Sequence, residues 1–339
     1  MAVLTGADWL QVGADAQHSN WQRFGNRIST RNTGELKLLW KRRLENRSRG
    51  ANSLTAPVIL GPIITHRGVK ELVFVGGASD NLFAVDADLG KVFWTRHIDV
   101  PDDAPAQPPC GAGLTAAPLI APPPPGAKIP EESDEGNSPM RPFYFVASDG
   151  VLHTIRPSDS LDMAPPRPFV PAHAWVTALS WSDGWISAAT VHGCAGVRDG
   201  VWKINAADPR GEGKYAGPEG APSDSNWVDR DSTRWRYRAG KEGLRAFHGI
   251  AEAWRAAQMA GALPPLIMNG VLYVLAPGKG STHAVFYALD ARTGKQLYSS
   301  GEQVASFVDS SGLAVANGHI FFGTADNTLY CFGLPLEIE

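Results

Sequence analysis

Cysteine and histidine are the residue types of this sequence that could do chemistry, and several of them lie between apolar runs. Eight candidates combine a reactive or ring-bearing side chain with a place outside the expected strands: Cys110, His173, Trp175, His192, Cys194, His248, Trp254 and His283. Two thiols can form a disulfide, thiolates with imidazoles suit zinc or copper, and an imidazole can act as a base. All three chemistries are open at this point.

Several common reactive motifs are missing from the sequence. The 3 cysteines, Cys110, Cys194 and Cys331, have no C-x-x-C spacing, which argues against a zinc ribbon or a thioredoxin motif. No G-x-S-x-G elbow is present, so a Ser-His-Asp hydrolase has no support. Cys331 lies in LYCFG, which is typical of a buried, inert thiol in a strand.

The composition indicates a folded protein with a sizeable core. The chain has 339 residues, of which 43% are hydrophobic and 19% charged. The net charge of −3 gives no basic field for nucleic acid or for an anionic membrane. No apolar run is long enough for a transmembrane helix, and MAVLTGADWLQVGADAQ lacks the basic and apolar regions of a secretory signal.

An internal repeat positions the candidates. Five segments share the order strand, tight turn, strand: LVFVGGASDNLFAVD (72–86), FYFVASDGVLHTI (143–155), WISAATVHGCAGVRDGVWKIN (185–205), LYVLAPGKGSTHAVFYALD (272–290) and IFFGTADNTLYCFGL (320–334). Asp80-Asn81, Asp149-Gly150 and Asp326-Asn327 occupy three of the turns. These residues tolerate the backbone conformations of two-residue hairpins, so the aspartates are expected to form turns and not to act as acids.

The repeats extend to four strands, which predicts an all-β fold, a single β-propeller domain. Short apolar segments precede the hairpins, and DADLGKVFW and DARTGKQLY add a fourth strand. Because one such sheet cannot bury both faces alone, the units should repeat around an axis. Five blades are visible and five to seven are expected, the visible ones being 52–98, 113–171, 174–238, 262–299 and 311–335.

Two segments need separate predictions. The N-terminal segment 1–45 contains LKLLWKRRL (36–44), which resembles a fourth strand and should pair with 328–333, closing the ring. Residues 206–262 could hide a degenerate blade. Within them, GLRAFHGIAEAWRAAQMAGAL (243–263) has apolar residues at helical spacing, so a short helical insert is expected near 243–261. Its apolar face should pack on the propeller, or alternatively bind a partner.

The propeller architecture sorts the candidates onto one face. Connections between blades and the turn between the second and third strands lie on the same face. Cys110, His173 and Trp175 fall in connections, and His192, Cys194 and His283 in such turns. His248 and Trp254 fall in the insert, also in a connection. The mouth of the central axis on this face is therefore the expected site for a small molecule or a protein partner.

The residues also carry a family resemblance. DWLQVGADAQHSNWQ (8–22) and FVGGASDNLFAVDADLGKVFW (74–94) resemble the pyrroloquinoline-quinone-like propeller repeat. This repeat occurs in bacterial quinoprotein dehydrogenases and in the propeller lipoprotein of outer-membrane assembly. The resemblance implies a periplasmic or extracellular protein. Its dehydrogenases hold the quinone between a Trp and a ring of two neighbouring cysteines, with calcium and an Asp base. No Cys-Cys pair occurs here, so no cofactor is expected, and quinone with calcium is the alternative.

These observations favour an exported scaffold that binds a ligand or a protein through the face carrying Cys110, His192 and Cys194. One alternative is an oxidoreductase that binds quinone or a metal there, and another is a lyase or hydrolase with His173, His192 or His248 as base. Export favours a Cys110–Cys194 disulfide with Cys331 left as a thiol. A metal site from Cys110, His192 and Cys194 is the alternative to that disulfide. Whether the protein is an enzyme stays open.

Overall fold

The computed structural model describes residues 8–25, 27–48, 53–100, 110–122, 141–219, 224–309 and 312–335. These residues form β-strands and three short 3-10 helices, η1 (Thr33–Glu35), η2 (Cys194–Gly196) and η3 (Ala257–Met259). Within this part of the chain, no helix has the length and apolar character of a membrane span. The described residues divide into two compact units. The middle unit comprises 10–12 and 45–219, and the terminal unit comprises 8–9, 13–44 and 224–335.

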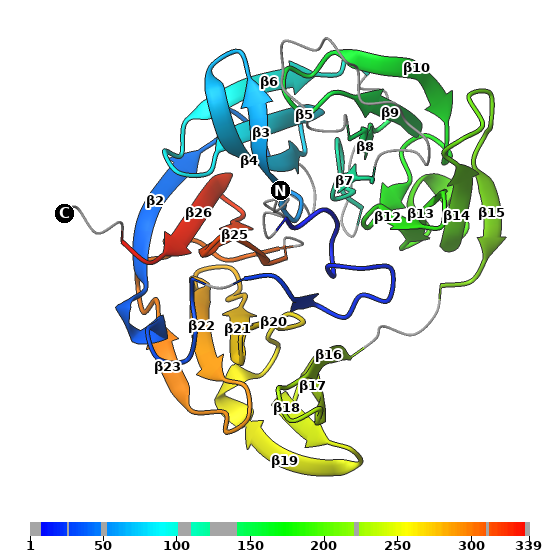
Figure 1. The fold of residues 1–339 in the computed structure, drawn as a ribbon. Helices are drawn as coiled ribbons and strands as arrows, with labels where there is room; N and C mark the ends of the chain where they lie inside the picture. The colour runs from blue at the N-terminus through cyan, green and yellow to red at the C-terminus, as the bar shows by residue number, and fades with distance from the viewer. Residues whose placement is uncertain are drawn as a thin grey trace. The chain divides into compact units, whose positions relative to one another are not determined.

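The middle unit contains three antiparallel sheets (Figure 1). The first sheet consists of β3 (Val58–Thr65), β4 (Gly68–Gly77), β5 (Asn81–Asp86) and β6 (Val92–His97). The second consists of β7 (Leu119–Ile120), β8 (Phe143–Val146), β9 (Val151–Ile155) and β10 (Asp162–Pro168). The third consists of β11 (Trp175–Val176), β12 (Ser180–Ser182), β13 (Trp185–Val191), β14 (Gly200–Asn205) and β15 (Lys214–Gly217), with β11 and β12 both paired to β13.

The terminal unit contains three further sheets (Figure 1). One consists of β16 (Ser225–Val228), β17 (Arg234–Gly240), β18 (Gly243–His248) and β19 (Ala251–Ala256). The next consists of β20 (Leu266–Met268), β21 (Val271–Ala276), β22 (Val285–Asp290) and β23 (Gln296–Ser299), with β1 (Trp21–Gln22) added parallel to β20. The last combines β2 (Lys37–Arg43) with β24 (Ala314–Ala316), β25 (His319–Gly323) and β26 (Thr328–Gly333).

The expected fold class is confirmed, because every sheet contains four antiparallel strands in the form of a propeller blade, to which the third sheet adds β12 and the β20–β23 sheet adds β1. The described residues form six such sheets, which falls within the expected five to seven. The turn predictions also hold: Asp80, Gly150 and Asn327 have φ values of 54°, 79° and 65°. In the middle unit the Asp80 carboxylate accepts hydrogen bonds from the Ser148 backbone N–H at 3.0 Å and from its hydroxyl at 2.9 Å. A turn aspartate thus links the first sheet to the second.

The N-terminal strand completes the last sheet, as the sequence predicts. β2 pairs antiparallel with β26 from Lys37 opposite Gly333 to Arg43 opposite Thr328. The Trp40 ring lies 5.8 Å from the Phe321 ring of β25. Without β2, the backbone groups of β26 on that edge would be unpaired.

The predicted helical insert near 243–261 is wrong. Residues 243–256 form the hairpin of β18 and β19, and only Ala257–Met259 form a 3-10 turn. Leu244 and Phe247, which would share one face of a helix, lie on opposite faces of β18, because β18 pairs with β17 in an unbroken register. Ile250, expected on the apolar face of the helix, is 98% exposed at the hairpin tip.

The same region corrects one blade boundary. The range 174–238 holds the third sheet of the middle unit together with β16 and part of β17, which belong to another sheet. Residues 224–256 are therefore the degenerate blade that 206–262 could hide. The acidic, proline-rich stretch 120–142 has its residues 123–140 outside the described residues.

Apolar side chains fill the space between neighbouring sheets within each unit. Phe74 of the first sheet meets Phe143 of the second, with ring centroids 4.9 Å apart. Trp235 of β17 belongs to one cluster with Leu272 of β21. The sheets therefore share their cores face to face, and the turns at the strand ends remain at the surface.

The pairing of β2 with β26 leads to a first prediction. Deleting residues 1–45 removes β2, exposes an edge of β26 and takes Trp40 from its contact with Phe321. We expect the melting temperature to fall by roughly 10 °C, since the lost packing is worth several kcal/mol. Thermal unfolding followed by circular dichroism measures the change, with the exposed substitution Lys37→Gln as control. An unchanged melting temperature in the truncated protein would contradict the role of β2.

Candidate functional site

A disulfide joins two of the candidate residues in the middle unit. Cys110 and Cys194 are bonded, with their Cα atoms 5.7 Å apart and a separation of 84 residues in the sequence. The predicted pairing is confirmed. Cys331, buried in β26 of the terminal unit, takes no part in it. The bond uses both thiols, so the alternative metal site of Cys110, His192 and Cys194 has no thiolate ligands in this form.

The turn that carries Cys194 has an unusual backbone held by local hydrogen bonds. His192, Gly193 and Ala195 have φ values of 66°, 60° and 55°. The Gly193 N–H donates to the Asp199 carboxylate at 2.7 Å, across the turn. Cys194 is buried, with 2% of the residue exposed. Because non-glycine residues seldom adopt positive φ, the bond to buried Cys194 and the Asp199 contact fix a turn that the sequence would otherwise disfavour.

His192 of this turn lies beside Trp175. Trp175 of β11 pairs with Val191, the last residue of β13, and the His192 ring lies 5.0 Å from the Trp175 ring. His192 itself is exposed. The Val176 N–H donates to the Thr115 hydroxyl at 3.0 Å, which ties the segment after Cys110 to β11. We call Cys110, Trp175, His192 and Cys194 the disulfide cluster.

His173 lies near the second sheet and not in this cluster. Its backbone N–H donates to the Ser148 carbonyl at 2.7 Å, and its φ is 58°. Ser148 is the residue held by the Asp80 carboxylate. His173 is thus placed by the turn between β8 and β9, through the backbone.

The remaining candidates belong to the terminal unit. His248 ends β18, and its ring stacks on Trp235 at 5.6 Å. The Trp254 indole N–H donates to the Ala291 carbonyl at 3.1 Å, so Trp254 packs against a turn between strands of the neighbouring sheet. His283 lies between β21 and β22. That all eight candidates share one face stays a prediction, since these residues and the disulfide cluster belong to different units.

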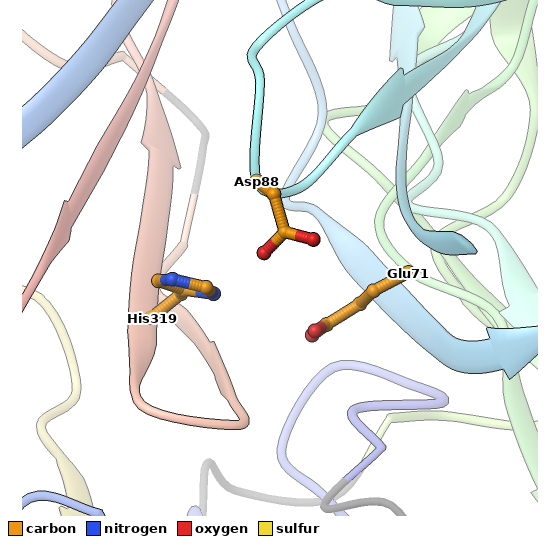
Figure 2. A group of neighbouring side chains, drawn as sticks. All are labelled: Glu71, Asp88 and His319. Atoms are coloured by element: carbon orange, nitrogen blue, oxygen red, sulfur yellow. The ribbon is translucent and has the colours of Figure 1, made fainter. Parts of the chain in front are cut away.

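Two carboxylates of the first sheet also lie close together. Figure 2 shows Glu71 of β4 and Asp88 of the turn after β5. In that turn Asp86 accepts from the Asp88 backbone N–H at 3.1 Å and forms an ion pair with Lys70 at 2.8 Å. His319, also drawn in Figure 2, belongs to β25 of the terminal unit, where its ring lies 5.9 Å from that of Phe321. Glu71 and Asp88 alone supply fewer ligands than a protein metal site takes.

His153 is a titratable residue that the sequence reasoning missed. It lies buried in β9 and stacks on Phe145 with ring centroids 4.8 Å apart. Within the described residues, neither of its ring nitrogens has a hydrogen-bond partner. Burial lowers the pKa of His153 and Arg96 lowers it further, whereas Asp149 and Asp162 raise it. The only signal in the sequence is one histidine inside the otherwise apolar strand VLHTI.

The quinone cofactor that the family resemblance implies does not fit the residues present. The expected ring needs two neighbouring cysteines, and here Cys110 is bonded to Cys194 of a distant segment. The buried side of Cys194 also leaves little sulfur surface for a flat ligand. The Cys110–Cys194 disulfide therefore holds a turn and does not form the ring of two neighbouring cysteines that would contact the quinone.

Comparisons with known proteins give structural neighbours but no family. No family model matches the chain, and no curated protein matches it. One similar structure is a quinohemoprotein alcohol dehydrogenase from Comamonas testosteroni, with 16% identity and a TM-score of 0.41 over 95% of this chain. Another is BamB from Moraxella catarrhalis, with 14% identity and a TM-score of 0.32, covering 88% of this chain and 99% of that one. The chain spans 48% of the alcohol dehydrogenase, about half its length.

The burial of His153 predicts a pH dependence of stability. Its pKa in the folded protein lies below the unfolded value of 6.5, so the unfolded chain binds the proton first as pH falls. Stability is unaffected by this group above about pH 6.5 and declines below it, by at most about 1.4 kcal/mol per pH unit. Urea unfolding between pH 7 and pH 5 should show a smaller decline for His153→Leu than for the wild type. The exposed His66→Leu variant should keep the wild-type slope, and equal slopes in all three would contradict the assignment.

The cysteine pairing predicts a thiol count. The protein denatured without reductant should show one reactive thiol, from Cys331, and three after reduction. Replacing both Cys110 and Cys194 with Ala should lower the free energy of unfolding by up to about 4–5 kcal/mol, because the bond closes a long loop. Thiol titration and urea unfolding measure the two effects. Three thiols in the unreduced protein would contradict the pairing.

Proposed function

We propose that the protein is an exported scaffold that binds a ligand or a partner protein through the disulfide cluster. The observation that carries the proposal is a bonded, conformationally fixed turn that presents an exposed His192 beside Trp175. A surface that is rigid before binding loses little conformational entropy on association. Tryptophan and neighbouring polar groups are common in the centre of binding sites.

The disulfide also supports export. Such bonds form and persist in oxidising compartments such as the bacterial periplasm, and they are rare in the cytosol. A periplasmic or extracellular location is therefore part of the proposal. The family resemblance of residues 8–22 and 74–94 points to the same location.

Binding is favoured over catalysis by what surrounds His192. Its described ring contact is with Trp175, an aromatic neighbour that cannot orient a general base in the way a carboxylate does. Asp199, the nearby acid of the turn, is engaged by the Gly193 N–H at 2.7 Å. These contacts support a surface for binding, since the described ring contact of His192 is aromatic.

Substitution within the cluster tests the proposal. The Trp175→Ala/His192→Ala variant should lose a ligand or protein that the wild type retains from a cell-envelope extract, by at least tenfold in the amount bound. The His66→Ala variant, altered at another exposed histidine of the same unit, should retain it. Equal retention by all three proteins would contradict the proposed site.

A second measurement separates the scaffold from the oxidoreductase alternative. Calorimetry with pyrroloquinoline quinone and calcium should show weak binding or none, because the neighbouring-cysteine ring is not formed. Tight binding that depends on calcium would instead favour the oxidoreductase, and the scaffold proposal would fail.

A further inference from the structure

One face of the β16–β19 sheet carries an unusual concentration of arginine. Along β17, Arg234, Arg236 and Arg238 alternate with the buried Trp235 and Tyr237. Since successive side chains of a strand point to opposite faces, the three arginines share the face away from the apolar cluster. β18 and β19 add Arg245 and Arg255 to it. We call these five residues the arginine face (Figure 1 shows the sheet).

The arginines of this face lie directly opposite one another. Arg238 of β17 pairs with Arg245 of β18, and Arg245 pairs with Arg255 of β19. Like charges in such cross-strand positions destabilise a sheet. In a row of three across three strands, neighbouring carboxylates have to offset this repulsion.

Carboxylates hold the guanidinium groups in place. Asp224 accepts from the Nε of Arg238 at 2.8 Å and from its second nitrogen at 2.9 Å. Glu252 accepts from the Nε of Arg245 and of Arg255, each at 2.8 Å. These hydrogen bonds, with that from Arg255 foremost, lower the pKa of Glu252. The carboxylates orient the arginines but do not cover them, since the side chains of Arg238 and Arg255 remain 55% and 45% exposed.

The ring of Phe247 contacts three guanidinium groups of the arginine face. The guanidinium carbons of Arg236, Arg238 and Arg245 lie 5.4, 5.8 and 5.0 Å from the centre of the Phe247 ring. A cation over an aromatic ring is attracted to it. The carboxylates and the Phe247 ring thus preorganise the row, whose side chains stay partly exposed.

We propose that the arginine face docks a carboxylate-rich segment of a partner protein. Arg238 and Arg255 each use two of their five N–H donors on Asp224 or Glu252, which leaves three on each for the carboxylates of a partner, and a preorganised row loses little entropy on binding. Five arginines face three acids, Asp224, Glu242 and Glu252, so the face is positive in a chain whose net charge is −3. The inference is independent of the disulfide cluster, which lies in the other unit.

Two features of the face favour an acidic protein segment over a nucleic acid. Phe247 is only 9% exposed beneath the guanidinium groups and offers no surface on which bases could stack. The acids within the face limit its positive charge, whereas a phosphate polymer is bound by an extended basic field. A short segment with a few carboxylates matches both the size of the row and its modest charge.

Fluorescence anisotropy with a short, labelled, glutamate-rich peptide tests the proposal on the full chain. The wild type should bind the peptide, with an affinity that falls as salt increases. The triple variant Arg238→Gln/Arg245→Gln/Arg255→Gln should bind at least about tenfold more weakly, given the strength of charge-assisted pairs. The control Lys37→Gln/Lys41→Gln/Arg43→Gln changes the charge equally, on the exposed strand β2, and should bind within about twofold of the wild type.

Circular dichroism must show that the triple variant is folded. If it is not, the single substitution Arg238→Gln, at the most exposed arginine of the row, replaces it and should weaken binding at least about threefold. Absence of peptide binding to the wild type, or an equal loss in the β2 control, would overturn the proposal. Binding of DNA or of anionic vesicles without binding of the peptide would also overturn it.

Discussion

Burial on both faces of a strand is the constraint on which most of this structure depends. In β4 the consecutive residues Leu72, Val73, Phe74 and Val75 are all 0% exposed, so both faces of the first sheet are covered. One four-stranded sheet cannot bury two apolar faces by itself, and it therefore needs a neighbouring sheet on each side. The contact of Phe74 with Phe143 is one result of this need. The turns, which carry polar residues, are then left at the strand ends.

The polar contacts of the middle unit follow from that arrangement. Once packing sets two sheets face to face, the turn aspartate of one reaches the turn of the next, as Asp80 reaches Ser148. The disulfide also links neighbouring sheets, since it joins the segment before the second sheet to a turn of the third. His153 shows the cost of this packing for a polar group. It is enclosed beside Phe145, and burial disfavours its charged form and lowers its pKa.

The fold could be predicted where the sequence signals are local. The Asp80, Asp149 and Asp326 turns and the apolar runs beside them define hairpins within a few residues, and Trp40 marked the strand that pairs with β26. The helical insert was wrongly predicted because the apolar residues at helical spacing are spread over a hairpin, with Leu244 buried in β18 and Ile250 exposed at the tip. The disulfide was favoured because exported proteins oxidise such cysteine pairs, and the bond between Cys110 and Cys194 confirms it. The contact of His192 with Trp175 and the hydrogen bond from Val176 to Thr115 depend on pairings between distant segments, which no local pattern encodes.

The blade that was hardest to find in the sequence is also the one whose surface chemistry differs most. The strands of a sheet with two buried faces have continuous apolar sequences such as LVFV, which a search for repeats detects. The β16–β19 sheet instead alternates strictly, as RWRYR does, because Trp235 and Tyr237 pack inward while the arginines face solvent. One face of this sheet is therefore not apolar, and it carries arginines in directly opposite cross-strand positions. Packing alone gives no reason for that arrangement, whereas recognition of an acidic surface does. The weak repeat signal and the charged face are therefore two consequences of the same change in residue pattern.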